Sequence, residues 1–172
     1  MKKSSGFTLV ELLIVIVIIG ILASIGLSSF ASAQAKSRDA KRKANLSQIA
    51  SALELYYNDK GTYPADSSGG TGNFKICGEL GTSECVWGED GLTNTVNSRT
   101  TTYMVKLPTD PIPTKYRYYY NSTSTYYQLY ARLENTNDKE ISQTIIDKNL
   151  DCDYDGSTAV CNYGVSSGNT TP

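Results

Sequence analysis

The chain of 172 residues contains no histidine, the side chain most often used as a general base or metal ligand near neutral pH. This absence excludes hydrolases with a Ser-His-Asp triad and metal enzymes that hold their metal through histidine. We therefore expect no enzymatic activity, and we assign no catalytic residue.

The chain also lacks an excess of positive charge, with 16 Lys and Arg against 17 Asp and Glu. A nucleic-acid-binding protein normally carries a basic field that attracts the phosphate backbone. We expect no nucleic-acid partner. The length of the chain fits one domain.

Apolar residues are concentrated in one run, Phe7 to Phe30, in which Glu11 is the one ionisable side chain. A helix of this length would be about 36 Å long, enough to cross a hydrocarbon layer of about 30 Å. Lys2 and Lys3 precede the run and favour a cytoplasmic N-terminus. The rest of the chain would then lie outside the cytoplasmic membrane.

Two simpler interpretations of this run are a cleaved secretory signal and a plain membrane anchor. The sequence Ala31-Ser32-Ala33 would serve as a signal-peptidase site. Both interpretations leave Glu11 unexplained, because a carboxylate in a membrane helix costs about 2.5–3.5 kcal/mol and is usually retained for a partner.

The stretch from Lys2 to Glu11 (KKSSGFTLVE), followed by an Ile/Val/Leu run, resembles the class III signal of type IV pilins and type II secretion pseudopilins. The resemblance implies that a prepilin peptidase removes residues 1–6 after Gly6 and methylates the amine of Phe7. It also implies that Glu11 pairs with the N-terminal amine of a neighbouring subunit, which lets each buried charge compensate the other. Many members have proline where this chain has Ser28.

A basic stretch follows the run, residues 36–43 (KSRDAKRK), on the predicted outer side and against the positive-inside rule. It could be a patch for nucleic acid or anionic lipid. We interpret it instead as a solvated helix face at the membrane exit, and we give the leader motif more weight than the charge rule.

Beyond this stretch the apolar residues take helical spacing and predict one amphipathic stripe: Leu46, Ile49, Ala50, Leu53 and Tyr57. We therefore expect one helix over 7–58, with 7–30 as membrane and filament-core segment and 31–58 as the half that packs on a head. Glycine and proline in residues 60–64 (KGTYP) end it. The string over 52–64 is similar to the helix end of G-type pseudopilins.

The remaining residues, 59–172, predict a globular head. Residues 65–100 are polar and glycine-rich and predict a long connecting loop. Strands are predicted at 101–107, 116–120 and 126–133, the last two joined by a hairpin loop over 121–125. The many tyrosines suit a half-buried sheet better than a stacking platform.

Four cysteines stand in the head: Cys77, Cys85, Cys152 and Cys161. Neither near pair is Cys-x-x-Cys and histidine is absent, so disulfides in an exported domain are favoured over zinc. Of three possible connectivities we favour the sequence-near one, Cys77 with Cys85 and Cys152 with Cys161, because each bridge closes a short loop.

Within the second loop, Asp151, Asp153 and Asp155 precede Gly156, as at the start of an EF-hand calcium loop. The twelfth position is Asn162 rather than glutamate, so half of the pattern is missing. G-type pseudopilins bind calcium in a C-terminal loop, which favours a calcium site here. The alternative is a solvated acidic turn.

Together these features predict an α+β subunit, in which a long N-terminal helix packs against a small antiparallel sheet with disulfide-stapled loops. We expect a structural subunit of a type IV pilus-like filament, made first as a single-pass precursor in the cytoplasmic membrane with its head outside. The expected partners are further copies of itself, the prepilin peptidase and an inner-membrane assembly platform. The alternatives are a periplasmic type II secretion pseudopilin and a secreted or anchored binding module.

Overall fold

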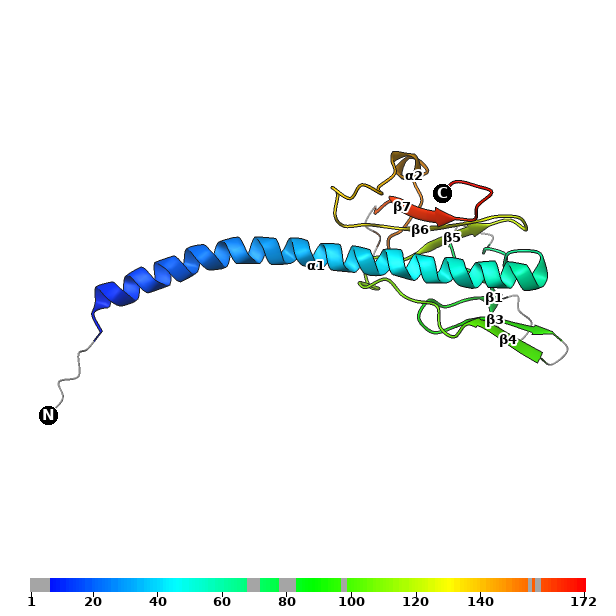
Figure 1. The fold of residues 1–172 in the computed structure, drawn as a ribbon, viewed down its shortest axis with the longest axis horizontal. Coiled ribbons are helices and arrows are strands. Elements are labelled where there is room, and N and C mark those ends of the chain that lie inside the picture. Colours follow the sequence, from blue (N-terminus) through cyan, green and yellow to red (C-terminus); the bar gives the residue numbers. More distant parts are fainter. Residues whose placement is uncertain (1–6, 68–71, 78–82, 97–98, 155, 157–158) are drawn as a thin grey trace. The chain divides into compact units, whose positions relative to one another are not determined.

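The computed structural model describes residues 7–67, 72–77, 83–96, 99–154, 156 and 159–172. The chain divides between Ser37 and Arg38 into two compact units. The first unit contains the apolar part of the long N-terminal helix. The second unit contains the amphipathic part of that helix together with the described strands (Figure 1).

One helix, α1 (Leu9–Lys60), runs through both units without a break. It begins and ends two residues later than predicted. The amide of Gly61 donates to the carbonyl of Tyr57 at 2.7 Å. Gly61 has a φ of 72°. A left-handed glycine of this kind closes many helices because it has no Cβ to clash.

The amphipathic half of α1 buries the predicted stripe. Leu46, Ile49 and Leu53 are fully buried, and Ala50 and Tyr57 are partly buried. They join a core that also contains Phe74, Leu129 and several tyrosines. The 3.6-residue period thus gave the correct buried face.

The strands form three small antiparallel sheets, which confirms the α+β class. The first pairs β1 (Lys75–Cys77) with β2 (Ser83–Glu84), and the second pairs β3 (Leu92–Val96) with β4 (Arg99–Met104). The third has the order β5 (Tyr119–Ser122), β6 (Tyr127–Ala131), β7 (Tyr163–Ser166). A short helix, α2 (Gln143–Asp147), precedes β7.

The prediction of one loop over 65–100 was wrong. This region contains β1, β2 and β3, and it places Phe74, Ile76 and Leu92 in the core. These apolar residues stand singly among polar neighbours, and the threonine-rich hairpin of β3 and β4 is largely solvated on β4. Neither feature produces the run of alternating apolar residues that indicates a strand.

The three strands that were predicted are present with shifted bounds. The first, expected at 101–107, is β4 and ends at Met104; the second, expected at 116–120, is β5 and begins at Tyr119. The hairpin turn closes with Thr123 N–H donating to the Tyr126 carbonyl at 2.9 Å. Strand β7 was not predicted. Its Gly164 lies so close to β6 that a Cβ would be 2.9 Å from the Leu129 carbonyl oxygen.

Two disulfides staple the head, Cys77–Cys85 and Cys152–Cys161, the sequence-near pairs. The first links β1 to the residue after β2. The second is buried in a smaller cluster with Tyr130 and Ile145. Each bridge therefore holds a polar segment against an apolar cluster.

Candidate functional site: the assembly segment and the head charge cluster

The start of α1 is a capping box formed by Thr8 and Glu11. The Thr8 amide and hydroxyl both donate to Glu11 Oε2, at 2.9 and 2.7 Å, and the Glu11 amide reaches Thr8 Oγ1 at 3.3 Å. The box satisfies N–H groups that the first turn of a helix leaves free. Glu11 Oε1 makes no hydrogen bond to any residue that the structure describes, so this oxygen can accept from another molecule.

The first unit exposes its apolar side chains. The exposed fraction is 80% for Phe7, 86% for Leu9 and 51% for Ile14. An apolar surface of this size is unfavourable in water, so we expect lipid or protein to cover it. By length and composition, α1 is the one helix in the described residues that could cross a membrane.

The basic stretch 36–43 is not a uniformly solvated helix face, and that interpretation was wrong. Arg42 is fully buried in the second unit and contacts three carboxylates. Its Nε lies 2.6 Å from Asp110 Oδ2, and its Nη1 lies 2.8 Å from Asp39 Oδ1 and 2.6 Å from Glu134 Oε1. Burial opposes the charge of Arg42, but its hydrogen bonds to Asp110 and Glu134 raise its pKa. We call these four residues the Arg42 cluster.

The Arg42 cluster is completed by backbone donors and by a second arginine. Asp39 accepts the amides of Glu134 and Asn135 at 2.9 and 2.8 Å. Arg38 binds Glu134 with two hydrogen bonds of 2.8 and 2.6 Å. The hydrogen bonds from Arg38, with the one from Arg42, lower the pKa of Glu134 from its ordinary 4.5 to about 2. Every charge in this cluster therefore has a counterpart, as burial requires.

The other basic residues of the stretch differ in their environment. Lys43 contacts Asp138 and Glu140, each at 2.9 Å. Lys36 and Lys41 are exposed and make no ion pair within the described ranges, as expected for a solvated face. The stretch thus alternates between anchoring residues and surface residues.

The acidic turn keeps its described carboxylates occupied within the chain. Asp151 accepts from Arg117 at 2.6 Å and from the Asp153 amide at 2.9 Å. Asp153 accepts the amide of Tyr154 at 2.8 Å. Asp155 lies outside the described residues. No group of three acidic, cysteine or histidine side chains gathers at one point in the part of the chain described, which does not include Asp155, so calcium binding by this turn stays a prediction.

The structure thus places the sequence-derived residues in three regions. Phe7 and Glu11 stand at the start of α1, the cysteines staple the head, and the exposed Asp151 and the buried Asp153 flank Cys152; Gly6 and Asp155 lie outside the described residues. Sequence reasoning missed the Arg42 cluster. Its one sequence signal is an Asp39/Arg42 pair at helical i, i+3 spacing.

Comparison with known proteins shows the family to which the chain belongs. The family model for the prokaryotic N-terminal methylation motif matches residues 1–27. A type II secretion system core protein G from Pseudomonas aeruginosa is 30% identical over 137 residues, covering 76% of this chain and 83% of that protein. The chain belongs to the type IV pilin and type II secretion pseudopilin family.

Other relatives share mainly a shorter stretch with this pilin-family chain. The type IV major pilin protein PilA of Myxococcus xanthus is 41% identical over 61 residues, 36% of this chain and 28% of that protein. Fimbrial protein EcpC of Eikenella corrodens is 44% identical over 67 residues, 39% of this chain and 44% of that protein. The chain thus matches less than half the length of these two relatives. No solved structure matches the chain.

Proposed function

We propose that this pilin-family chain is a structural subunit of an extracytoplasmic filament of the type IV pilus kind. The observation that carries the proposal is the combination of a free Glu11 Oε1 at the start of α1 with an apolar helix surface that needs a cover. A membrane can cover this surface before assembly, and the helices of other subunits can cover it in the filament.

Leader cleavage must come before assembly, because cleavage creates the amine with which Glu11 of a neighbouring subunit would pair. Removal of residues 1–6 by a prepilin peptidase eliminates Lys2 and Lys3 and creates an amine on Phe7, which is then methylated. Glu11 Oε2 already holds Thr8, so Oε1 is left to accept from the amine of a neighbouring subunit. Both charges are poorly solvated among packed helices, and their pairing fixes the register between two subunits.

A second candidate is a major pseudopilin of a type II secretion system. The favouring observation is that the match to the P. aeruginosa core protein G extends over 83% of that protein, whereas the two pilin matches cover 28% and 44%. A pseudopilin would assemble through the same segment but into a short periplasmic filament that takes part in protein export.

Two measurements test the proposal. The intact mass of the membrane-extracted protein should correspond to a chain that starts at N-methylated Phe7, whereas a chain starting at Gln34 would refute it. Electron microscopy of producing cells with an antibody to the head should then show long surface filaments. Labelled filaments restricted to the periplasm would instead identify the pseudopilin.

A further inference from the structure

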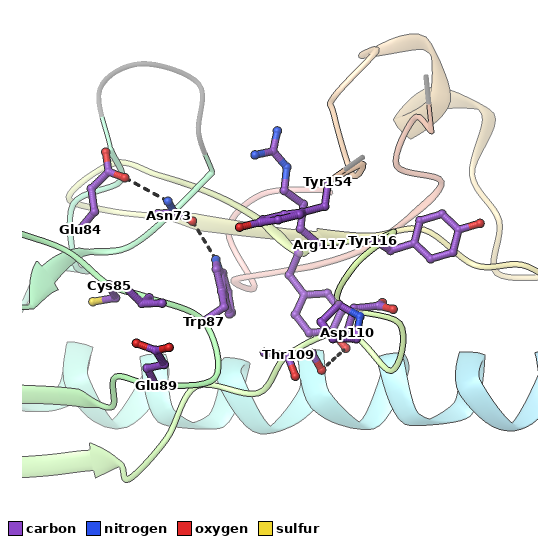
Figure 2. Close-up of a pocket in the computed structure, with 13 residues that line it drawn as sticks. Asn73, Glu84, Cys85, Trp87, Glu89, Thr109, Asp110, Tyr116, Arg117 and Tyr154 are labelled. Carbon is purple, nitrogen blue, oxygen red and sulfur yellow. Dashed lines mark hydrogen bonds between the residues drawn. The ribbon is translucent and has the colours of Figure 1, made fainter. Parts of the chain in front are cut away.

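The head contains a cavity of about 450 Å³ that the proposed assembly does not use. It lies between the segment after β2 and the segment that connects β4 to β5 (Figure 2). Four aromatic side chains line it: Trp87, Tyr116, Tyr118 and Tyr154. All its described lining residues belong to the second unit, so the cavity is a feature of the head alone.

Trp87, one of the four aromatic residues, is held in place by a chain of hydrogen bonds. Trp87 Nε1 donates to Asn73 Oδ1 at 2.8 Å, and Asn73 Nδ2 donates to Glu84 Oε2 at 3.0 Å (Figure 2). The Trp87 ring also meets the buried Tyr118 ring edge to face, with 5.7 Å between centroids. A ring held in this way needs little further ordering when a ligand binds.

The charges around the cavity do not balance. Asp110 is neutralised by Arg42, and Arg117 is neutralised by Asp151. Glu84 and Glu89 also line the cavity, and neither forms an ion pair with any described residue. The Tyr116 ring already faces two cations of the chain, Arg42 at 5.0 Å and Lys115 at 5.2 Å from its centroid. The lining therefore presents the other three aromatic rings and two uncompensated carboxylates.

From these contacts we infer that the cavity binds an organic cation, either a guanidinium or an alkylammonium group. Aromatic faces attract such cations through their quadrupole, and the two carboxylates supply the opposite charge. An anion would meet the same two carboxylates, and Arg117, the cation among the described lining residues, is already paired with Asp151. The group can come from the side chain of a second copy of the chain or from a free amine, and the two sources share this chemistry.

Trp87 is the one tryptophan in the chain, so its fluorescence reports on the cavity without background. The full mature chain, dispersed as subunits in a nonionic detergent, is titrated with arginine amide. N-acetylglucosamine serves as a neutral probe and glutamate as an anionic probe. We expect a saturable change in Trp87 emission with arginine amide alone, weakened by added salt because salt screens the carboxylates.

The double variant Glu84→Gln/Glu89→Gln should bind arginine amide about tenfold more weakly, since two charge contacts are lost. Glutamine at position 84 can still accept the hydrogen bond from Asn73, so the double variant should keep the geometry of the cavity. An unchanged melting temperature would show that its fold is intact. Glu54→Gln removes a carboxylate from the exposed side of α1 and should leave the titration unchanged. The inference is overturned by no saturable response to arginine amide, by an equal response to the neutral or anionic probe, or by an unchanged affinity in the double variant.

The same titration on sheared filaments identifies the source of the cation and is the one arm that rests on the proposed function. If a neighbouring copy fills the cavity, the Trp87 emission of filaments should already equal that of subunits saturated with arginine amide. Adding arginine amide to the filaments should then cause no further change. If the ligand is a free amine, filaments respond as dispersed subunits do. Either result keeps the cation site, which the measurement on subunits tests independently of assembly.

Discussion

Arg42 and Asp110 are 68 residues apart in the sequence, yet they form two parallel hydrogen bonds in the core of the head. Nε reaches Oδ2 at 2.6 Å and Nη2 reaches Oδ1 at 2.8 Å. Asp110 Oδ1 also accepts the Ile112 amide at 2.8 Å. The pair therefore ties the amphipathic half of α1 to the proline-rich segment before β5, through charges that water cannot replace.

The Asp110→Asn substitution should destabilise the head strongly. It leaves a buried guanidinium short of a counter-charge, and breaking a buried pair costs about 3–5 kcal/mol. We expect a loss near 3 kcal/mol because Asp39 and Glu134 remain in contact with Arg42. Denaturant unfolding of the full chain in nonionic detergent measures it. Asp147→Asn, a matched change at an exposed position of α2, should cost little, and equal losses in both variants would contradict the role assigned to Asp110.

Because of Glu134, the stability of the head should decrease as the pH falls into the acidic range. The pKa of Glu134 is lowered by Arg38 and Arg42 to about 2 in the folded state, below its ordinary 4.5. The stabilisation is therefore complete above about pH 5 and is lost as the pH falls from there toward 2, by on the order of 2–3 kcal/mol. Melting temperatures measured across this range should fall less steeply in Glu134→Gln. A parallel fall in both proteins would assign the acid sensitivity to other groups.

The disulfides should account for all four cysteines. Unfolded, unreduced protein exported to an oxidising compartment should show no free thiol, and peptide mapping should find Cys77 with Cys85 and Cys152 with Cys161. Reduction should lower the melting temperature, because each bridge contributes on the order of 2–4 kcal/mol. Four reactive thiols, or bridges between the two pairs, would be inconsistent with the structure.

The calcium hypothesis for the acidic turn makes its own prediction. An ion bound by Asp151, Asp153 and Asp155 would raise the melting temperature of the full chain, since a ligand of the native state stabilises it by mass action. Because Arg117 holds Asp151, Arg117→Ala should increase the calcium effect. Melting curves of both proteins that do not change at millimolar calcium would leave a solvated acidic turn.

Sequence patterns predicted the parts of this molecule that depend on local spacing. The stripe containing Leu46, Ile49 and Leu53 follows from helical period, and the cysteine pairs follow from short loops. The Arg42 cluster could not be predicted, because Asp110 and Glu134 stand 68 and 92 residues from Arg42 and only the folded chain brings them together. Strand β7 was missed because Gly164 interrupts its pattern where the backbone of β6 approaches closely.

Two substitutions separate the capping contacts of Glu11 from its proposed pairing with a neighbouring subunit. Glutamine at position 11 can still complete the capping box with Thr8, but it carries no charge for a neighbour's amine. Thr8→Ala has the opposite effect: it removes the hydroxyl contacts of 2.7 and 3.3 Å and keeps the carboxylate. We expect processing and membrane insertion to be retained in both variants, since Gly6 and Phe7 are unchanged.

The amount of sheared filament per amount of membrane subunit tests the assembly role of Glu11 most directly. Glu11→Gln should produce few or no filaments, because an amine left unpaired among packed helices costs on the order of 3–5 kcal/mol. Thr8→Ala and the head control Glu54→Gln should assemble close to normally. Normal filament yield from Glu11→Gln, with the processed protein present in the membrane, would show that Glu11 is not the contact through which these subunits assemble.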